Sequence, residues 1–557
     1  MSSECYESSR NVQVLSVLNK LSAQSGGVTR VAMARAKMLS ESGCRSLIAT
    51  AEYDPLLLNS VYLLRQDGRL GQSVNVVNFF YYYAIVSKAG EDIAQISDFF
   101  VRSDVVELER KSRYVGLTGL RSSEYLDANG RIFAREIIDS ENQVVSFQLD
   151  LVGRGVLNFK TRDEAYTHWL NEITRFADFT ILIADASTKA KAVSKVSASS
   201  ARKVLTLHGN HFAKPYIYGS PVTVVSGRIL DSARFADSLV LLTNAQMKDV
   251  DRQFHDLKDV RVIPNSVSIE PSPKALRDNR RFVVVSRLET VKNIDMIIRA
   301  FRIALEQCEE LRLDIWGHGS REKDIQELIV ENDLTEHVTL KGYANPVSQV
   351  FAQARGSISA SVSEGFGLSI LESMSFGCPV ISLSSNYGPV EIVKDGVNGY
   401  LVSDEVEMAG RIVSLASDDE EFAEMSQESF KSALEYAPSV IAKKWLVLVQ
   451  DLISANWQVD MVKYSNKMTN QFSSVGGNII FSSLSVDDLD GYRQIEVMRI
   501  DRAKKWKEQA CLIQAGVYDI HSIGRDASNR LVVKFAQGAI VYNGVIPAGS
   551  IEFRFSS

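Results

Sequence analysis

The residues best suited to chemistry are two cations and two carboxylates in the second half of the chain. Arg287 follows the apolar run 282–286, and Lys292 lies five residues further on. At the carboxyl end of a parallel strand, beside the start of a helix, positive charge and free backbone N–H groups converge on one place, which suits a diphosphate. Two solvated surface cations would give the same spacing, so the spacing alone leaves both interpretations open.

The two carboxylates flank a glycine-rich turn. Glu364 precedes the segment Gly365-Phe366-Gly367-Leu368, and Glu372 follows in an apolar stretch. The glycines permit a tight turn, and a helix that starts near Gly367 would direct its unpaired N–H groups at a phosphate. A carboxylate on a mostly apolar helix needs a polar partner. For Glu372 that partner is either a ligand hydroxyl or an arginine from a neighbouring element.

Three shorter motifs are weaker when taken alone. The pair Gly26-Gly27 opens a predicted helix, and the triplet Gly317-His318-Gly319 follows a predicted strand. The glycine pair could admit a phosphate, although a glycine turn needs no ligand, and the triplet taken alone is more often just a tight turn. His208 and His211 also follow a predicted strand, but no third metal ligand lies nearby. A single pocket histidine, His208, is therefore a more economical interpretation than a zinc site.

Two tandem series of strands and helices must position these residues. Buried-strand patterns of the first series lie at 12–18, 179–184, 203–207, 238–242 and 260–263. Those of the second series lie at 282–286, 311–316, 338–340, 356–360 and 379–382. Repeated strand–helix units predict parallel sheets covered on both faces, so the fold class is α/β with two doubly wound Rossmann-like domains.

Two regions depart from this pattern. Residues from about 61 to 160 alternate in polarity around the hairpin signal Asn129-Gly130, which predicts an antiparallel β insertion. Strand-like runs also follow the last helical stretch. The predicted organisation is a first Rossmann-like domain at 1–265, a second at 266–445, a closing helix at 446–470 and a small β-rich domain at 471–557.

The composition excludes several classes of protein. The 557 residues are 45% hydrophobic and 23% charged, which is typical of a globular protein, and the net charge of −6 argues against a nucleic-acid partner. Five dispersed cysteines argue against a disulfide framework or a zinc site. The longest apolar run, 79–86, is too short to cross a bilayer and no leader is evident, so we expect a cytoplasmic protein.

The order and spacing of the motifs over residues 11–455 resemble the retaining glycosyltransferases of family 4, and the segment 395–402 is similar to the family's segment downstream of the donor site. The resemblance implies the GT-B fold, in which two Rossmann-like domains face a cleft. It implies an acceptor domain first and a nucleotide-sugar domain second. It demands no metal or other cofactor.

The resemblance also implies a role for each motif. The catalytic set would be Arg287, Lys292, Glu364 and His208. In this set the two cations neutralise the leaving diphosphate, Glu364 contacts the donor sugar and His208 lines the acceptor side. The substrate-binding set would be Gly26, Gly27, Gly317, His318, Phe366, Gly367, Leu368 and Glu372. The backbone around Phe366-Gly367-Leu368 and at Gly27 would cap the phosphates, and Glu372 would hold the ribose hydroxyls.

The insertion narrows the resemblance. Residues 125–149 look like the β-meander of bacterial poly(glycerol-phosphate) or poly(ribitol-phosphate) α-glycosyltransferases that decorate wall teichoic acid. A similar insertion occurs in peptide N-acetylglucosaminyltransferases of adhesins. The implied reaction moves glucose or N-acetylglucosamine from a UDP-sugar to a hydroxyl of an anionic polyol-phosphate polymer or a protein. A homo-oligomer through the insertion is implied as well.

Some features of the sequence depart from the family pattern, and others leave alternative functions open. The family's usual Pro-Asn-Gly is Pro264-Asn265-Ser266 here, and the tail after about 470 is not part of the common core. The basic and aromatic cluster 499–507 in that tail is either a solvated face or a peripheral contact with anionic polymer or lipid. A non-catalytic partner subunit of the same fold is the rival to an enzyme, although clustered charges argue against it. An oxidoreductase would need a glycine fingerprint that is absent.

Overall fold

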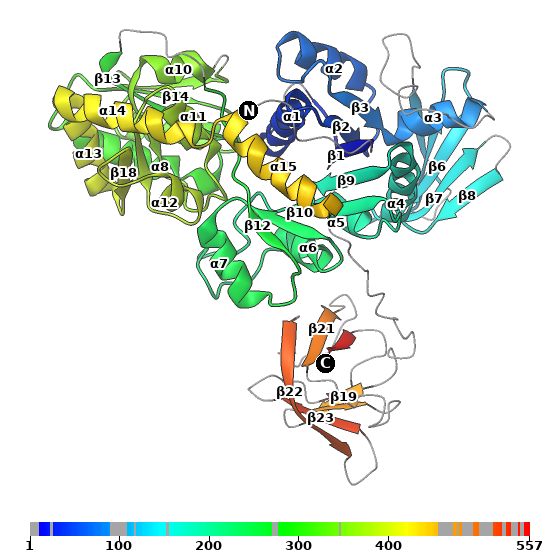
Figure 1. Ribbon diagram of the computed structural model, residues 1–557. Helices are drawn as coiled ribbons and strands as arrows, with labels where there is room; N and C mark the ends of the chain where they lie inside the picture. Colours follow the sequence, from blue (N-terminus) through cyan, green and yellow to red (C-terminus); the bar gives the residue numbers. More distant parts are fainter. Residues whose placement is uncertain are drawn as a thin grey trace. The chain divides into compact units, whose positions relative to one another are not determined.

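The computed structural model divides into two units (Figure 1). It describes residues 11–22, 26–89, 108–115, 119–151, 155–269, 277–344 and 347–454, and seven strands between 472 and 556. The larger unit holds the chain up to 454 apart from 248–258, and the smaller unit holds 248–258 and the chain from 455. All the predicted catalytic and substrate-binding residues belong to the larger unit.

A seven-stranded parallel sheet forms the centre of the first domain. Its strands are β1 (Val12–Leu18), β2 (Arg45–Thr50), β3 (Asn75–Asn78), β9 (Phe179–Ala184), β10 (Ala201–Thr206), β11 (Ser238–Leu241) and β12 (Val260–Val262). Their spatial order is β12-β11-β10-β9-β1-β2-β3. Every residue of β1 is buried, as expected of a central strand covered on both faces.

Helices connect and cover these strands. They are α1 (Gly27–Glu41), α2 (Leu57–Gln66), α3 (Phe79–Ala89), α4 (Arg162–Ile173), the 3-10 turn Thr174–Phe176, α5 (Ser187–Ser194), α6 (Val224–Ala233) and α7 (Asn244–Gln253). The sequence predicted five of the seven strands and missed β2 and β3. β2 opens with Arg45 and Ser46, and β3 has only two valines between its terminal asparagines, so neither shows a long apolar run.

The predicted antiparallel insertion is present. Its strands are β4 (Glu109–Tyr114), β5 (Arg121–Leu126), β6 (Ile132–Ile138), β7 (Val144–Leu151) and β8 (Gly155–Phe159). They pair in chain order, each antiparallel to the next. The predicted hairpin turn joins β5 to β6, where Gly130 has a φ of 76° that an L side chain rarely adopts.

The insertion begins later than residue 61, which corrects the predicted boundary. Residues 57–89 form α2, β3 and α3, and β3 pairs in parallel with β2 as part of the Rossmann sheet. The aromatic run after β3 is a helix because the side chain of Asn78 caps it, accepting hydrogen bonds from the backbone N–H groups of Phe80 at 2.9 Å and Tyr81 at 3.3 Å.

The second domain holds a six-stranded parallel sheet. Its strands are β13 (Asp278–Val285), β14 (Arg312–Trp316), β15 (Val338–Gly342), β16 (Ala354–Ser359), β17 (Val380–Leu383) and β18 (Gly399–Val402). Their order is β15-β14-β13-β16-β17-β18. The sequence predicted all of these strands except β18.

Helices again cover the faces of this sheet. They are the 3-10 turn Thr290–Lys292, α8 (Ile294–Leu305), α9 (Glu322–Glu331), α10 (Val347–Gln353), α11 (Leu368–Ser375), α12 (Gly388–Ile392), α13 (Glu405–Ser417) and α14 (Asp419–Leu434). Ile297 and Phe301 on α8 pack with Ile412 on α13 in one continuous core with the strands.

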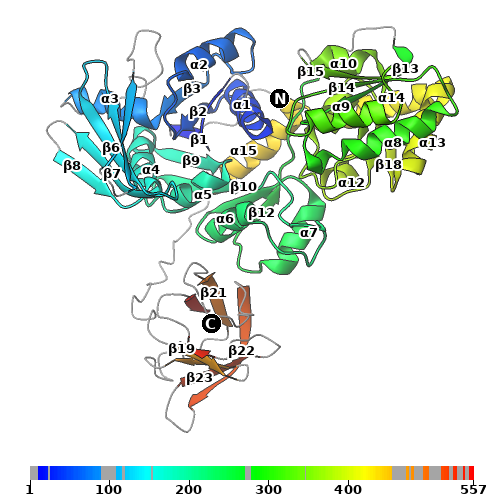
Figure 2. The same cartoon turned by 180° about the vertical axis from the view of Figure 1, so that it is seen from behind.

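A long helix, α15 (Pro438–Ser454), returns from the second domain to the first (Figure 2). Its apolar face packs on the first domain, where Trp445 and Leu448 join the core formed by Val14 and Ile183. The helix begins earlier than the predicted closing segment, and residues 455–470 of that segment lie outside the described residues.

The smaller unit contains an antiparallel sheet. Its strands are β19 (Phe472–Val475), β20 (Asn478–Phe481), β21 (Gln494–Ile500), β22 (Gly516–Arg525), β23 (Leu531–Phe535), β24 (Gly544–Val545) and β25 (Ile551–Ser556). The limits of a domain at 471–557 stay a prediction, and the basic cluster lies outside the described residues from 501 onward. Among the described helices, none combines the length and apolarity needed to cross a membrane.

Candidate active site

A cavity of about 1000 Å³ lies where loops after strands of both Rossmann-like domains meet. Asn19, Asp185 and His208 line it from the carboxyl ends of β1, β9 and β10. Arg287 and Val291 line it from the loop after β13. Ligands of doubly wound sheets bind at the carboxyl ends of the strands, so this cavity is the candidate active site.

Lys292 and Glu364 form an ion pair in the second domain. The Lys292 ammonium lies 2.5 Å from a Glu364 carboxylate oxygen, and both side chains are largely buried. Lys292 ends the 3-10 turn before α8, and Glu364 lies in the loop after β16. A backbone hydrogen bond of 3.0 Å from Val362 to Val291 holds the two loops together. The structure therefore brings together two of the predicted catalytic residues.

Arg287 is the cation that remains available. It is exposed at the cavity and has no ion pair among the described residues. The backbone of two glycines, Gly317 and Gly319, packs closely against the loop that carries Arg287. A Cβ on Gly317 would lie 1.8 Å from the carbonyl oxygen of Ser286, and a Cβ on Gly319 would lie 2.2 Å from that of Leu288. Close backbone packing thus accounts for both glycines without a ligand.

His318 and Phe366 do not direct their side chains into the cavity. The His318 ring is 60% exposed and pairs with Glu322 at 3.0 Å. The Phe366 ring is buried 5.8 Å from the ring of Tyr436. The binding roles of these two residues stay predictions.

The glycine-rich turn brings the two domains into contact. A Cβ on Gly365 would lie 2.2 Å from the carbonyl oxygen of His208, so only glycine lets these two loops approach so closely. Gly367 has a φ of 90° and forms the N-cap of α11. Leu368, the first residue of that helix, approaches Gly27 of α1, where an added Cβ would lie 3.8 Å from it.

Glu372 pairs with Arg30, an arginine from a neighbouring element, which is one of the two kinds of partner considered for it. Arg30 lies on α1 of the first domain and Glu372 lies on α11 of the second. Burial lowers the pKa of Arg30. A ribose would have to share or displace this pair. Gly26 is the N-cap of α1, with open space around its Cα, and residues 23–25 lie outside the described residues.

Sequence reasoning missed two buried residues behind His208. Arg35 on α1 makes a two-pronged pair with Asp185, with nitrogen–oxygen distances of 2.9 and 2.5 Å. Asp185 lies 3.0 Å from Nε2 of His208. Burial alone would raise the pKa of Asp185, but the charge and hydrogen bonds of Arg35, together with His208, lower it to about 2. The available signals were an arginine inside an apolar helical stretch and an aspartate directly after a predicted strand.

His211 is a buried structural histidine. Its ring is stacked on the ring of Tyr387 in the second domain at a centroid distance of 5.7 Å. Burial lowers the pKa of His211 to about 4. Within the part of the chain that the structure describes, no group of three histidine, cysteine or acidic side chains could hold a metal ion.

Two facing Rossmann-like domains with a cationic site between them define the GT-B class of glycosyltransferases. Residues 268–432 match the family model described as "Glycosyl transferases group 1". Over these residues the chain matches a family-4 glycosyltransferase, as the sequence motifs predicted. It is an enzyme of this class.

Curated relatives include glycosyltransferases that act on polyol-phosphate polymers or on peptides. The chain is 24% identical over 474 residues to the poly(glycerol-phosphate) alpha-glucosyltransferase of Bacillus subtilis, covering 80% of this chain and 68% of the relative. It is 26% identical to the poly(ribitol-phosphate) alpha-N-acetylglucosaminyltransferase of Staphylococcus aureus, covering 58% and 66%. It is 30% identical to the GtfA subunit of the peptide N-acetylglucosaminyltransferase of Streptococcus gordonii, covering 53% and 61%. The last two alignments thus span slightly less than two thirds of the relatives.

A solved structure confirms the fold. The crystal structure of S. aureus TarM with fondaparinux, α-GlcNAc-glycerol and UDP superposes with a TM-score of 0.64 at 21% identity, covering 80% of this chain and all of TarM. The likeness establishes the GT-B architecture of the larger unit.

Proposed function

We propose that the protein transfers glucose or N-acetylglucosamine, with retention, from a UDP-sugar to a hydroxyl of a polyol-phosphate polymer of the teichoic-acid type. The observation that carries this proposal is that Arg287 and His208 line one cavity from the two domains, while the Lys292–Glu364 ion pair lies next in the chain to Val291, another lining residue. The relatives named above act on such polymers and on such sugars.

The cations fit the departure of a nucleoside diphosphate. When the bond from the sugar's anomeric carbon to the diphosphate oxygen breaks, negative charge develops on that oxygen. Arg287 and Lys292 stabilise this charge, and the N-terminus of α11 adds backbone dipoles, provided all are in place before the reaction. Lys292 is held in advance by Glu364. Part of the conformational entropy of the Lys292 side chain is therefore lost on folding and not on substrate binding.

Glu364 has a second role in the proposal. Its carboxylate has two oxygens, and Lys292 engages Oε2. The other oxygen can accept a hydrogen bond from a donor-sugar hydroxyl, which orients the sugar relative to Lys292. No enzymic nucleophile is required if the acceptor hydroxyl attacks the same face from which the diphosphate leaves and gives its proton to the departing phosphate.

A peptide acceptor is the second candidate. It is favoured by the 30% identity to GtfA, the highest value among the three relatives. The two acceptor classes differ in charge, because a polyol-phosphate carries one anion per repeat and a serine-rich peptide carries none. Binding of the polymer would therefore weaken with rising salt, whereas binding of a serine-rich peptide would weaken little.

Release of UDP by the purified full-length chain tests the proposal. UDP-glucose and UDP-N-acetylglucosamine are supplied in turn with a glycerol- or ribitol-phosphate polymer, with a serine-rich peptide, or without acceptor. Polymer-stimulated release with one donor supports the proposal and identifies the sugar. Release of UDP that is stimulated by the peptide would identify the acceptor as a peptide, as in the name of the GtfA relative. Donor binding without release under any condition would favour a non-catalytic partner subunit.

Matched variants connect the activity to the site. We expect Lys292→Ala and Arg287→Ala each to lower turnover about 100-fold or more, because each removes charge stabilisation from the transition state. Arg302→Ala on α8 removes an exposed arginine that pairs only with Glu306 and serves as the control. Full turnover by both site variants in folded protein would refute the site assignment.

Further parts of the proposal concern assembly and location. A homo-oligomer would form through the antiparallel insertion, and the enzyme would work in the cytoplasm at the inner face of the membrane. Light scattering of the chain, and of a variant lacking residues 109–159, tests the assembly. Flotation with lipid vesicles tests the membrane contact.

A further inference from the structure

Three buried side chains connect the interior of the first domain to the cavity. Arg35 and Asp185 have side-chain exposures of 2% and 0%, and His208 is 12% exposed at the cavity wall. Arg35 also donates to the hydroxyl of Ser16 at 2.7 Å. A buried arginine and aspartate are costly to desolvate, and packing alone would be served as well by apolar residues. We therefore expect the Arg35–Asp185 pair to have a function other than stabilising the fold.

The charge of Asp185 fixes the direction of its hydrogen bond with His208. Arg35 holds both carboxylate oxygens of Asp185, so the group is ionised at neutral pH. An ionised carboxylate can only accept hydrogen bonds. The contact of 3.0 Å therefore requires that Nε2 of His208 carry the proton. In the neutral ring the lone pair is then on Nδ1.

The opposite edge of the ring is the one left for substrate. His208 lines the large cavity, and no described residue makes a hydrogen bond with its Nδ1. A lone pair on Nδ1 would accept a hydrogen bond from a hydroxyl of the donor or the acceptor. If Nδ1 carried the proton, it could not accept a hydrogen bond from this hydroxyl. It could then only donate a hydrogen bond to the hydroxyl oxygen.

Arg35 determines which of these two states exists. If Arg35 were replaced by an apolar residue, the buried Asp185 would lose its compensating charge, and burial would favour the protonated acid. A protonated Asp185 donates its O–H. His208 would then accept at Nε2 and move its own proton to Nδ1, which reverses the polarity of the edge that faces the cavity.

We propose that Arg35 is a positioning residue that sets the tautomer of His208 through Asp185, so that Nδ1 accepts a hydrogen bond from a substrate hydroxyl. The role of the hydroxyl rests on the proposed function, whereas the tautomer does not. Arg35 never touches substrate in this scheme, because Asp185 and the His208 ring separate it from the large cavity.

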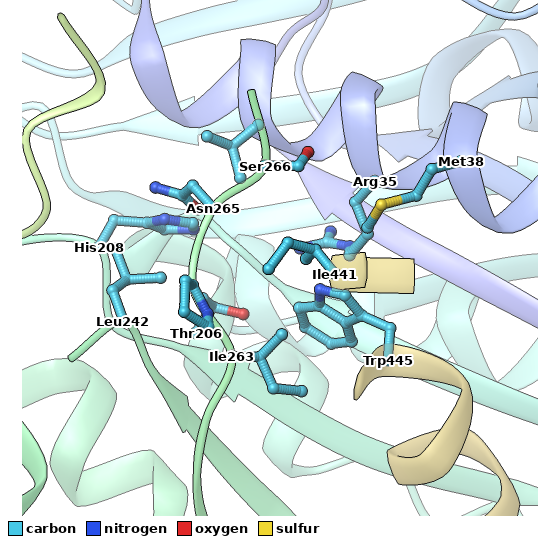
Figure 3. Close-up of a pocket in the computed structure, with 12 residues that line it drawn as sticks. Arg35, Met38, Thr206, His208, Leu242, Ile263, Asn265, Ser266, Ile441 and Trp445 are labelled. Atoms are coloured by element: carbon cyan, nitrogen blue, oxygen red, sulfur yellow. The ribbon is translucent and has the colours of Figure 1, made fainter. Parts of the chain in front are cut away.

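The closing helix supports this arrangement. The guanidinium of Arg35 lies over the ring of Trp445 on α15, 4.9 Å from the ring centroid. A second cavity, of about 20 Å³, lies between them and His208, with His208 on one side and Trp445 on the other (Figure 3). Arg35 is thus fixed by Asp185 and Ser16 on one side and by an aromatic face on the other.

Nitrogen NMR of the full chain labelled with ¹⁵N-histidine tests the tautomer directly, and the loss of one signal in His208→Gln assigns it among the seven histidines. We expect the wild type to show the proton on Nε2. Arg35→Lys keeps the charge and should keep this tautomer. Arg35→Met should move the proton to Nδ1. Arg355→Met, which removes another buried arginine far from His208, controls for lost stability and should leave the His208 signals unchanged.

Kinetics then connect the tautomer to function. Arg35→Met should lower kcat/KM for the acceptor by roughly 10- to 100-fold, the cost of one lost or reversed hydrogen bond, and Arg35→Lys should largely restore it. A wild-type proton on Nδ1, or the same tautomer in Arg35→Met and wild type, would overturn the proposal. If Arg35→Met fails to fold, the wild-type spectrum still shows whether the proton of His208 is on Nε2, as the proposal requires. If no transferase activity is found at all, the proposed function fails, and the spectra still test the tautomer.

Discussion

At the residue scale, the site consists of charges that are already paired before any ligand arrives. Lys292 pairs with Glu364 and Arg30 pairs with Glu372. Arg287 is the exception, exposed at the cavity without an ion pair among the residues described. A diphosphate would therefore meet one available cation first and then compete with carboxylates for the others. This order favours selective binding of a doubly charged group over a single carboxylate.

Histidine burial at the domain contact predicts a pH-dependent stability. Burial lowers the pKa of His211 from 6.5 to about 4, so between these values the unfolded chain binds a proton that the folded protein does not. Stability is then fully present above pH 6.5 and falls as the pH drops towards 4. The loss approaches about 3 kcal/mol at the low end.

Thermal unfolding at pH 7 and pH 5 measures this effect. His211→Gln, which cannot titrate, should remove most of the difference in Tm between the two pH values. His318→Gln, which alters an exposed histidine, should leave the difference as in the wild type. An unchanged difference in His211→Gln would assign the effect to other groups.

The residues that could be predicted from sequence share one property. Arg287, Lys292 and Glu364 lie close to glycines or strand ends within short stretches of chain, so local spacing reveals them. Arg35 and Asp185 are 150 positions apart. Their pairing depends on a helix and a strand end meeting in the folded domain, and no local pattern encodes that meeting.

At the element scale, α15 joins the two domains through its apolar face. Trp445 is buried in the first domain's core and covers Arg35. We expect Trp445→Ala to lower the free energy of unfolding by about 3–5 kcal/mol through the lost apolar contact and the cavity left behind. Urea denaturation measures this change.

A matched substitution on the same helix provides the control. Val447 is 57% exposed, so Val447→Ala should alter the free energy of unfolding by less than about 0.5 kcal/mol. Equal effects of the two substitutions would mean that α15 is not anchored through Trp445. A larger loss of turnover than of stability in Trp445→Ala would agree with the support that Trp445 gives to Arg35.

The elements predicted best were those with a continuous apolar run. The predicted and observed bounds of β1 and β9 coincide, because both strands are central and buried on both faces. β3 was missed because only its two central valines are apolar, and it is a strand because β2 supplies the pairing. β18, which pairs with β17, was missed as well. The start of the insertion was misplaced because the cap formed by Asn78 turns an aromatic run into a helix.

At the scale of the whole molecule, the cleft depends on how closely the loops of the two domains approach each other. The turn at Gly365 lies against the backbone of His208, and the N-terminus of α11 lies near that of α1. The two walls of the cavity, one from each Rossmann-like domain, are thus held together by backbone contact. The overall GT-B arrangement could be predicted from the motif order, whereas this contact could not, because it depends on the absence of one Cβ.

Gly365→Ala tests whether this approach is needed for turnover. The new Cβ would lie 2.2 Å from the His208 carbonyl oxygen, so the two loops must move apart, although each domain keeps its own core. We expect turnover to fall roughly 10- to 100-fold, since displacing reacting groups by about 1 Å has a cost of this order. Gly410→Ala is the control, because nothing lies within 4 Å of its Cβ on the exposed side of α13, where alanine favours the helix. Equal turnover in the two variants, at equal Tm, would show that the contact between Gly365 and His208 has no part in the reaction.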